Sequence, residues 1–132
     1  MNKPRVYFVS AGIVRSDGNG PNYELLATFG TIKNLIEADE GPKYTYDLPD
    51  RIMKRLESFD PDHDYIVWGG GDPLSLMLVG ACLVESGVES FRWLRLDRAM
   101  NPATGRRFPW TGNYVPVTIE LLAKEQMENE NE

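Results

Sequence analysis

Apolar residues occur in short runs along the chain, separated by polar and glycine-containing stretches. The continuously apolar run at 6–9, which ends in small residues at 10–12, predicts a buried and central first strand. The runs at 65–68 and 91–96 predict two further strands. Residues 114–121 instead alternate between apolar and polar positions, which is typical of a strand at the edge of a sheet.

Two helices are predicted between these strands. In the first, apolar residues recur at three- and four-residue spacing behind an N-cap at Asp47, and they are Leu48, Ile52, Leu56 and Phe59. The second runs from 74 to about 86, after Asp72 and Pro73, and ends at Gly87. This second helix is apolar around nearly its whole circumference, so we expect it to pack on two sides or against a sheet.

Periodicity leaves two stretches less defined. Residues 23–29 and 31–36, which Gly30 separates, fit either two strands or a strand and a helical turn. Residues 98–112 contain two prolines and two glycines and predict a long loop.

The order of the elements predicts an α/β fold, with a single domain of two or three layers over residues 1–122. Its sheet is mostly parallel, built on a right-handed parallel βαβ unit at 65–96. The last strand pairs antiparallel with the strand at 91–96 and forms the C-terminal edge. Residues 123–132 are expected to be an acidic, disordered tail.

The composition excludes several classes of protein. The chain has 132 residues, of which 42% are hydrophobic, and this suffices for one core without disulfide or metal support. Its single cysteine, Cys82, and single histidine, His63, exclude a disulfide framework and a Cys/His zinc set. The longest apolar run, at 74–84, is too short to span a bilayer, and we find no signal peptide. We therefore expect an intracellular domain that uses no metal and no cofactor.

A glycine turn between the strand at 65–68 and the second helix is the first candidate site. Gly69, Gly70 and Gly71 lead to Asp72 at the helix start, where free N–H groups and the helix dipole attract anions. The turn matches neither dinucleotide nor P-loop motifs, and the Asp72 carboxylate competes for the same N–H groups. We favour a structural turn with Asp72 as the N-cap over a ligand site.

A cluster of arginine residues is the second candidate. Arg92, Arg95, Arg98, Arg106 and Arg107 are opposed only by Asp97 within residues 92–107, and aromatic residues such as Trp110 lie among or beside them. Arginine with aromatic rings is typical of protein interfaces and of phosphate or base recognition. The candidate interaction residues are Arg95, Arg98, Arg106, Arg107 and Trp110. A net charge of −6 favours a protein partner over nucleic acid.

Catalytic patterns are weak. His63 lies in a turn of aspartates and is interpreted as a surface histidine, and Asp60, Asp62 and Asp64 lack the glycine and glutamate of a calcium loop. Cys82 lies among apolar residues and is interpreted as an inert core thiol. We therefore expect a binding protein rather than an enzyme.

Four segments together resemble small proteins encoded by tailed bacteriophages and prophages. In that group an FDPxxDY turn precedes an apolar strand, GDP opens an apolar helix, a strand ends in L-[KR]-x-D-R, and Tyr-x-Pro-Val closes the domain. The matching segments here are FDPDHDY at 59–65, GDP at 71–73, LRLDR at 94–98 and YVPV at 114–117. Two features depart from the pattern: Gly69 and Gly70 replace the one or two apolar or polar residues usual before GDP, and the segment at 98–114 is longer. The resemblance implies a phage context, the host cytoplasm and an α/β fold, but no catalytic residues.

These observations predict a small accessory protein that engages a host or phage macromolecule through the hairpin of arginine and aromatic residues. A protein partner fits this prediction best, and a membrane partner is not expected. The alternative is a protein that binds a nucleotide or another anionic small molecule at Gly69 to Gly71.

Overall fold

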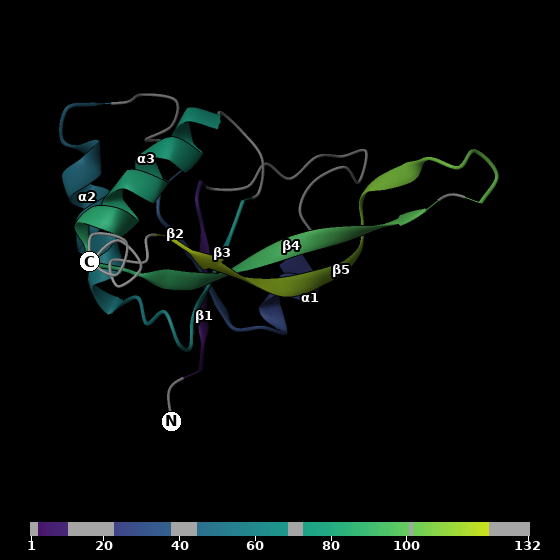
Figure 1. Cartoon of the computed structure of the whole chain (residues 1–132), viewed down its shortest axis with the longest axis horizontal. Coiled ribbons are helices and arrows are strands. Elements are labelled where there is room, and N and C mark those ends of the chain that lie inside the picture. Colours follow the sequence, from purple (N-terminus) through teal and green to yellow (C-terminus); the bar gives the residue numbers. More distant parts are fainter. Residues whose placement is uncertain (1–2, 11–22, 38–44, 69–72, 101, 122–132) are drawn as a thin grey trace, which may run out of the picture.

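The computed structural model of the chain describes residues 3–10, 23–37, 45–68, 73–100 and 102–121. They form one five-stranded sheet with the order β2-β1-β3-β4-β5 (Figure 1). Its strands are β1 (Arg5–Phe8), β2 (Thr31–Asn34), β3 (Tyr65–Val67), β4 (Ser90–Met100) and β5 (Arg107–Glu120). The first four are mutually parallel and β5 is antiparallel to β4. The predicted α/β class, with a mostly parallel sheet and an antiparallel C-terminal edge, is confirmed.

Helices cover both faces of this sheet. They are α1 (Tyr23–Ala27), α2 (Leu48–Arg55), which continues as the 3-10 turn η1 (Leu56–Ser58), and α3 (Pro73–Glu85). Strand residues alternate between the faces: Tyr7 and Ile66 contribute to the core beneath α2 and α3, whereas Phe8 and Val67 contribute to the core beside α1. None of the helices in the described part of the chain is long and apolar enough to cross a bilayer.

The apolar stripe of α2 and η1 packs as predicted. Leu48, Ile52 and Leu56 are buried, and the Phe59 and Tyr7 rings make a T-shaped contact with 5.5 Å between their centroids. The prediction for Asp47 is wrong in its mechanism, because its side chain caps no N–H group of the helix. Its backbone is already helical, at φ −93° and ψ 0°, and the carboxylate instead pairs with the Arg51 guanidinium at 2.8 Å.

The predicted loop at 98–112 is also wrong, because strand pairing extends much further than the apolar pattern. β4 continues to Met100, and β5 begins at Arg107, which pairs with Met100. Pro109 is tolerated there because β5 is an edge strand, where a missing N–H need not break a sheet ladder. The undecided stretch at 23–36 forms the helix α1 and the strand β2.

Candidate functional site

The distal parts of β4 and β5 form a two-stranded arm that projects from the body of the molecule (Figure 1). β3 pairs with β4 at Arg92 and Trp93, and within the described residues β5 is the sole neighbour of β4 from Leu94 onward. The exposed tip at 102–106 connects the strands. Most of the predicted loop at 98–112 therefore lies on the two strands, and only a short connection at the tip remains.

The arginine residues divide between the arm and its base. The Arg106 side chain is exposed at the tip of the arm. The Arg95 side chain is exposed near the base, between Leu94 and Leu96 of the core, and its Nη2 lies 3.9 Å from the Asp97 carboxylate. Arg92 belongs to the base, because its guanidinium carbon lies 4.0 Å from the centroid of the Tyr65 ring. The remaining candidates, whose backbone lies on the strands of the arm, are Arg98, Arg107 and Trp110.

The glycine turn at 69–72 lies outside the described residues, and its predicted role is not tested. The strand order nevertheless shows where the turn begins. The Val9 N–H donates to the Val67 carbonyl at 2.9 Å, so the carboxyl ends of β1 and β3 lie side by side. Along the chain, β2 pairs with one side of β1 and the next strand, β3, pairs with the other side. Open α/β sheets bind ligands where the strand order reverses in this way.

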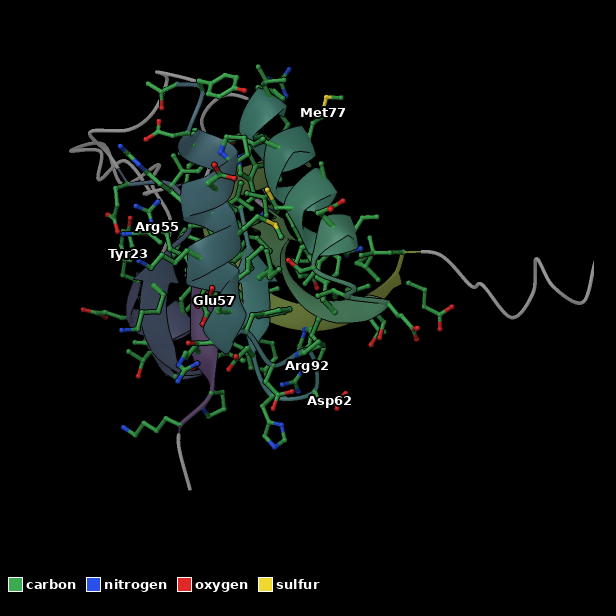
Figure 2. The ribbon with its side chains drawn as sticks, turned by 90° about the vertical axis from the view of Figure 1, so that its left-hand side faces the viewer. Tyr23, Arg55, Glu57, Asp62, Met77 and Arg92 are labelled. Carbon is green, nitrogen blue, oxygen red and sulfur yellow. The ribbon has the colours of Figure 1, made fainter. Side chains whose placement is uncertain are left out.

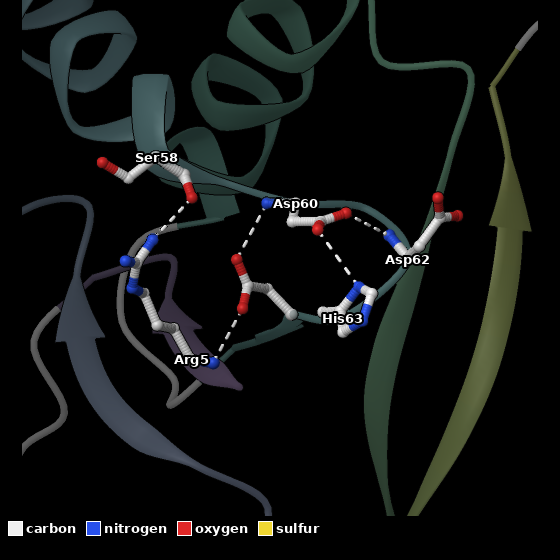
Figure 3. Close-up of polar contacts among 6 residues, drawn as sticks. Arg5, Ser58, Asp60, Asp62 and His63 are labelled. Carbon is white, nitrogen blue, oxygen red and sulfur yellow. Dashed lines mark hydrogen bonds and ion pairs between the residues drawn. The ribbon is translucent and has the colours of Figure 1, made fainter. Parts of the chain in front are cut away.

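The FDPxxDY turn has a structural role that sequence reasoning did not assign. Asp64 is buried, and its carboxylate accepts hydrogen bonds from the backbone N–H groups of Arg5 and Asp60, each at 2.8 Å (Figure 3). Asp60 accepts from the Asp62 N–H at 3.0 Å, and its other oxygen lies 3.1 Å from His63 Nδ1. The Asp60 and Asp64 carboxylates thus tie this turn to itself and to β1, and exposed His63 is a surface residue as predicted.

A small basic cavity lies between the strands β1 and β2 and the end of α2. Its volume is about 360 Å³, and its lining includes Arg5, Lys33 and Arg55 against one carboxylate, Glu37. The guanidinium groups of Arg5 and Arg55 donate to the carbonyls of Ser58 and Leu35 at 2.6 and 2.7 Å, respectively. These cations come from three separate elements, so no linear motif could reveal the cavity.

A larger cavity of about 750 Å³ lies at the amino end of β4, beside the end of α2. Met53, Leu56 and Phe59 supply apolar lining, whereas Glu57 and Asp62 contribute carboxylates (Figure 2). Both cavities are distinct from the arm.

The fold and surface define a small α/β protein with one mixed sheet and a basic arm that extends beyond it. A family model described as phage Pam3 gp32-like protein matches residues 4–103, and the chain belongs to this family. It is therefore a small phage-encoded protein, as the resemblance in its sequence implied. The matched residues include β1 to β4 and α3, and β5 follows them. No curated protein and no solved structure matches the chain.

Proposed function

We propose that this phage protein binds an acidic surface on another protein, of the phage or of its host, through the β4–β5 arm. The observation that supports the proposal is the projection of the arm (Figure 1). Its tip carries exposed Arg106 away from the body, and exposed Arg95 lies at its base, between Leu94 and Leu96 of the core. Within the described residues, each strand of the arm has one neighbour beyond the β3 pairing. A ribbon of this kind gains little stability by itself in water, so folding gives little reason for its length.

The charge distribution supports a protein partner. The whole chain carries a net charge of −6, which opposes broad contact with nucleic acid. Arginine on a narrow arm confines the electrostatic attraction for anionic groups to a small area. Exposed ion pairs add only about 0–1 kcal/mol each to the stability of a fold, so stability does not explain the arginine cluster. Arginine is enriched at protein interfaces, where it pairs with carboxylates in two-pronged geometry. This contact requires no catalysis.

The test is capture from phage-infected host cells, followed by identification, purification and titration of the captured protein. The double variant Arg95→Ala with Arg106→Ala should weaken binding at least about tenfold, equivalent to roughly 1.4 kcal/mol. The matched control is Arg51→Ala with Lys54→Ala, which removes the same charge from exposed positions on α2. The role of the arm would be overturned if both variants weakened binding equally, or if neither variant weakened it.

A second candidate function is the binding of a small anion such as a phosphate or a nucleotide. The basic cavity supports it, because Arg5, Lys33 and Arg55 converge on about 360 Å³ in a chain that is acidic overall. The glycine turn at 69–72 is the alternative position for the same class of ligand.

Thermal unfolding with inorganic phosphate or nucleotides tests both positions. A ligand at 100 times its Kd adds about 2.7 kcal/mol of stability. The Lys33→Ala variant should lose this gain if the cavity binds the anion, whereas Gly71→Ala should lose it if the turn does. Exposed Lys3 lies outside the cavity lining, so Lys3→Ala is the control for lost charge. No stabilisation by any of these anions would reject this function and leave the arm proposal untouched.

A further inference from the structure

The outer face of α3 is apolar and exposed. Leu74, Met77 and Val84 expose 48%, 72% and 62% of their surface, and Ala81 between them is also exposed. Met77 points away from the body of the molecule (Figure 2). The spacing of three, four and three residues is that of the seam between two paired helices.

Packing among the described residues does not account for this face. The opposite side of α3 is already buried in the core through Val79, Cys82 and Leu83. Residues 73–84 include no charged side chain, whereas the solvent face of a helix in an α/β protein is ordinarily polar. A helix that lies on a membrane surface combines its apolar face with lysine and arginine on the polar face, and α3 has neither. Exposed apolar patches of this kind mark interaction surfaces.

Gly80, near the middle of α3, is a second and independent observation. A Cβ atom placed on Gly80 would meet nothing within 4 Å, so the fold of the single chain gains nothing from the missing side chain. Glycine weakens a helix interior relative to alanine. Gly80 and Ala81 therefore place two small residues at the centre of the face. Small residues at a contact allow two helices to approach closely.

We propose that α3 docks against α3 of a second copy of this chain, in antiparallel orientation. We place the two-fold axis at the midpoint between Gly80 and Ala81, from which positions 77 and 84 are equally distant. Met77 then faces the partner's Val84, and the small residues meet at the crossing point. The absence of charge lets two chains of net charge −6 meet here without burying like charges.

The size of the face sets the strength of the dimer. A helix of 13 residues is only about 20 Å long, whereas a stable interface buries at least about 1,000 Å². The dimer should therefore form and dissociate with concentration rather than be permanent. This inference is independent of the function proposed for the arm.

Sedimentation equilibrium of the full chain tests the dimer. Its mass should rise from 15.0 kDa towards twice that value with increasing concentration. Met77→Glu should abolish the rise, and Gly80→Leu should abolish it without lowering the melting temperature, because space is open there in the single chain. Val115→Glu, an equally charged change at an exposed apolar residue of β5, should leave the dimer unchanged. A mass of 15.0 kDa at every concentration overturns the proposal.

Cysteine cross-linking tests the orientation and the competing occupant. In the antiparallel pair Ala81→Cys should form a disulfide with itself on oxidation, whereas Val84→Cys should require a partner chain that carries Met77→Cys. Buried Cys82 gives little background in the unsubstituted chain. Self-linkage of Val84→Cys would indicate a parallel pair and overturn the proposed geometry. A dimer that appears only after removal of residues 122–132 would show that this segment occupies the face instead.

Discussion

At the scale of single residues, Asp64 connects segments that are far apart in the chain. Its buried carboxylate joins the start of β1 to the turn before β3 through two backbone N–H groups (Figure 3). Hydrogen bonds to a charged group contribute roughly 1.5–3 kcal/mol, and their loss leaves buried donors without acceptors. Asp64 of the FDPxxDY turn thus has a structural role, which these hydrogen bonds carry.

Asp64→Ala should therefore lower the free energy of unfolding by about 2–4 kcal/mol in urea denaturation. Asp64→Asn should also destabilise, because its NH2 group cannot accept a hydrogen bond. The control is Asp62→Ala in the same turn, where the side chain is exposed and the expected change is within about 0.5 kcal/mol. Equal effects at the two positions would contradict this role.

Cys82 should be chemically inert in the folded protein. Burial raises the pKa of its thiol, and the negative charge of Asp50 raises it further, so little of the reactive thiolate forms at neutral pH. A thiol reagent such as DTNB should react slowly with the native chain and at an ordinary rate after denaturation. Rapid native labelling would show that α3 opens.

At the scale of elements, two glycines should respond in opposite ways to the same substitution. A Cβ on Gly30 would collide with the Pro4 carbonyl, where α1 turns into β2 beside the start of β1. Gly80 lies in open space within α3. Gly30→Ala should therefore lower the melting temperature, and Gly80→Ala should raise stability by up to about 1 kcal/mol through helix propensity. Thermal unfolding of the two variants measures both effects, and stabilisation by Gly30→Ala would contradict the close approach.

The arm should open more readily than the sheet from which it extends. Beyond Trp93 it lacks the β3 pairing, and two-stranded ribbons are marginally stable in water. Hydrogen exchange measured by mass spectrometry should be faster in peptides from 95–113 than in peptides from 90–94. Binding of the proposed partner should slow exchange in the arm selectively. Uniform protection along β4 in the free protein would indicate that another part of the chain covers the arm.

At the scale of the whole molecule, alkaline pH should destabilise the fold. Burial raises the pKa of Tyr7, although its hydrogen bond with Arg5 opposes the shift, and burial also raises the pKa of Tyr23. The unfolded chain releases these protons near pH 10, before the native chain does. This contribution to stability is thus complete below about pH 10 and is lost as pH rises through the higher native pKa values.

Urea unfolding between about pH 8 and 11 should show this decline. Tyr7→Phe and Tyr23→Phe should reduce its slope. Tyr46→Phe, at a fully exposed tyrosine, is the control for loss of a phenol group. If Tyr7→Phe and Tyr23→Phe left the slope unchanged, the decline in stability would arise from other groups.

Local sequence patterns predicted much of the fold of this chain. Continuous apolar runs identified β1 and β3 as buried strands, and the alternation at 114–121 identified the edge strand, because each pattern reflects which faces are covered. The stripe from Leu48 to Phe59 identified α2, and Gly87, at φ 80°, ends α3 as the pattern indicated. For the candidate site, the sequence identified the arginine cluster, because it is local in the chain.

Other features depend on contacts between distant residues and were decided by the tertiary structure. Residues 31–34 become a strand because β1 offers them a parallel neighbour, and β4 and β5 lengthen because each supplies hydrogen bonds to the other. The apolar composition of α3 could not show which side the sheet covers and which side stays exposed. The basic cavity combines residues from three elements. Local patterns thus predicted most of the elements and their order. The surfaces that remain available for binding follow from the folded chain, because exposure depends on packing between distant elements.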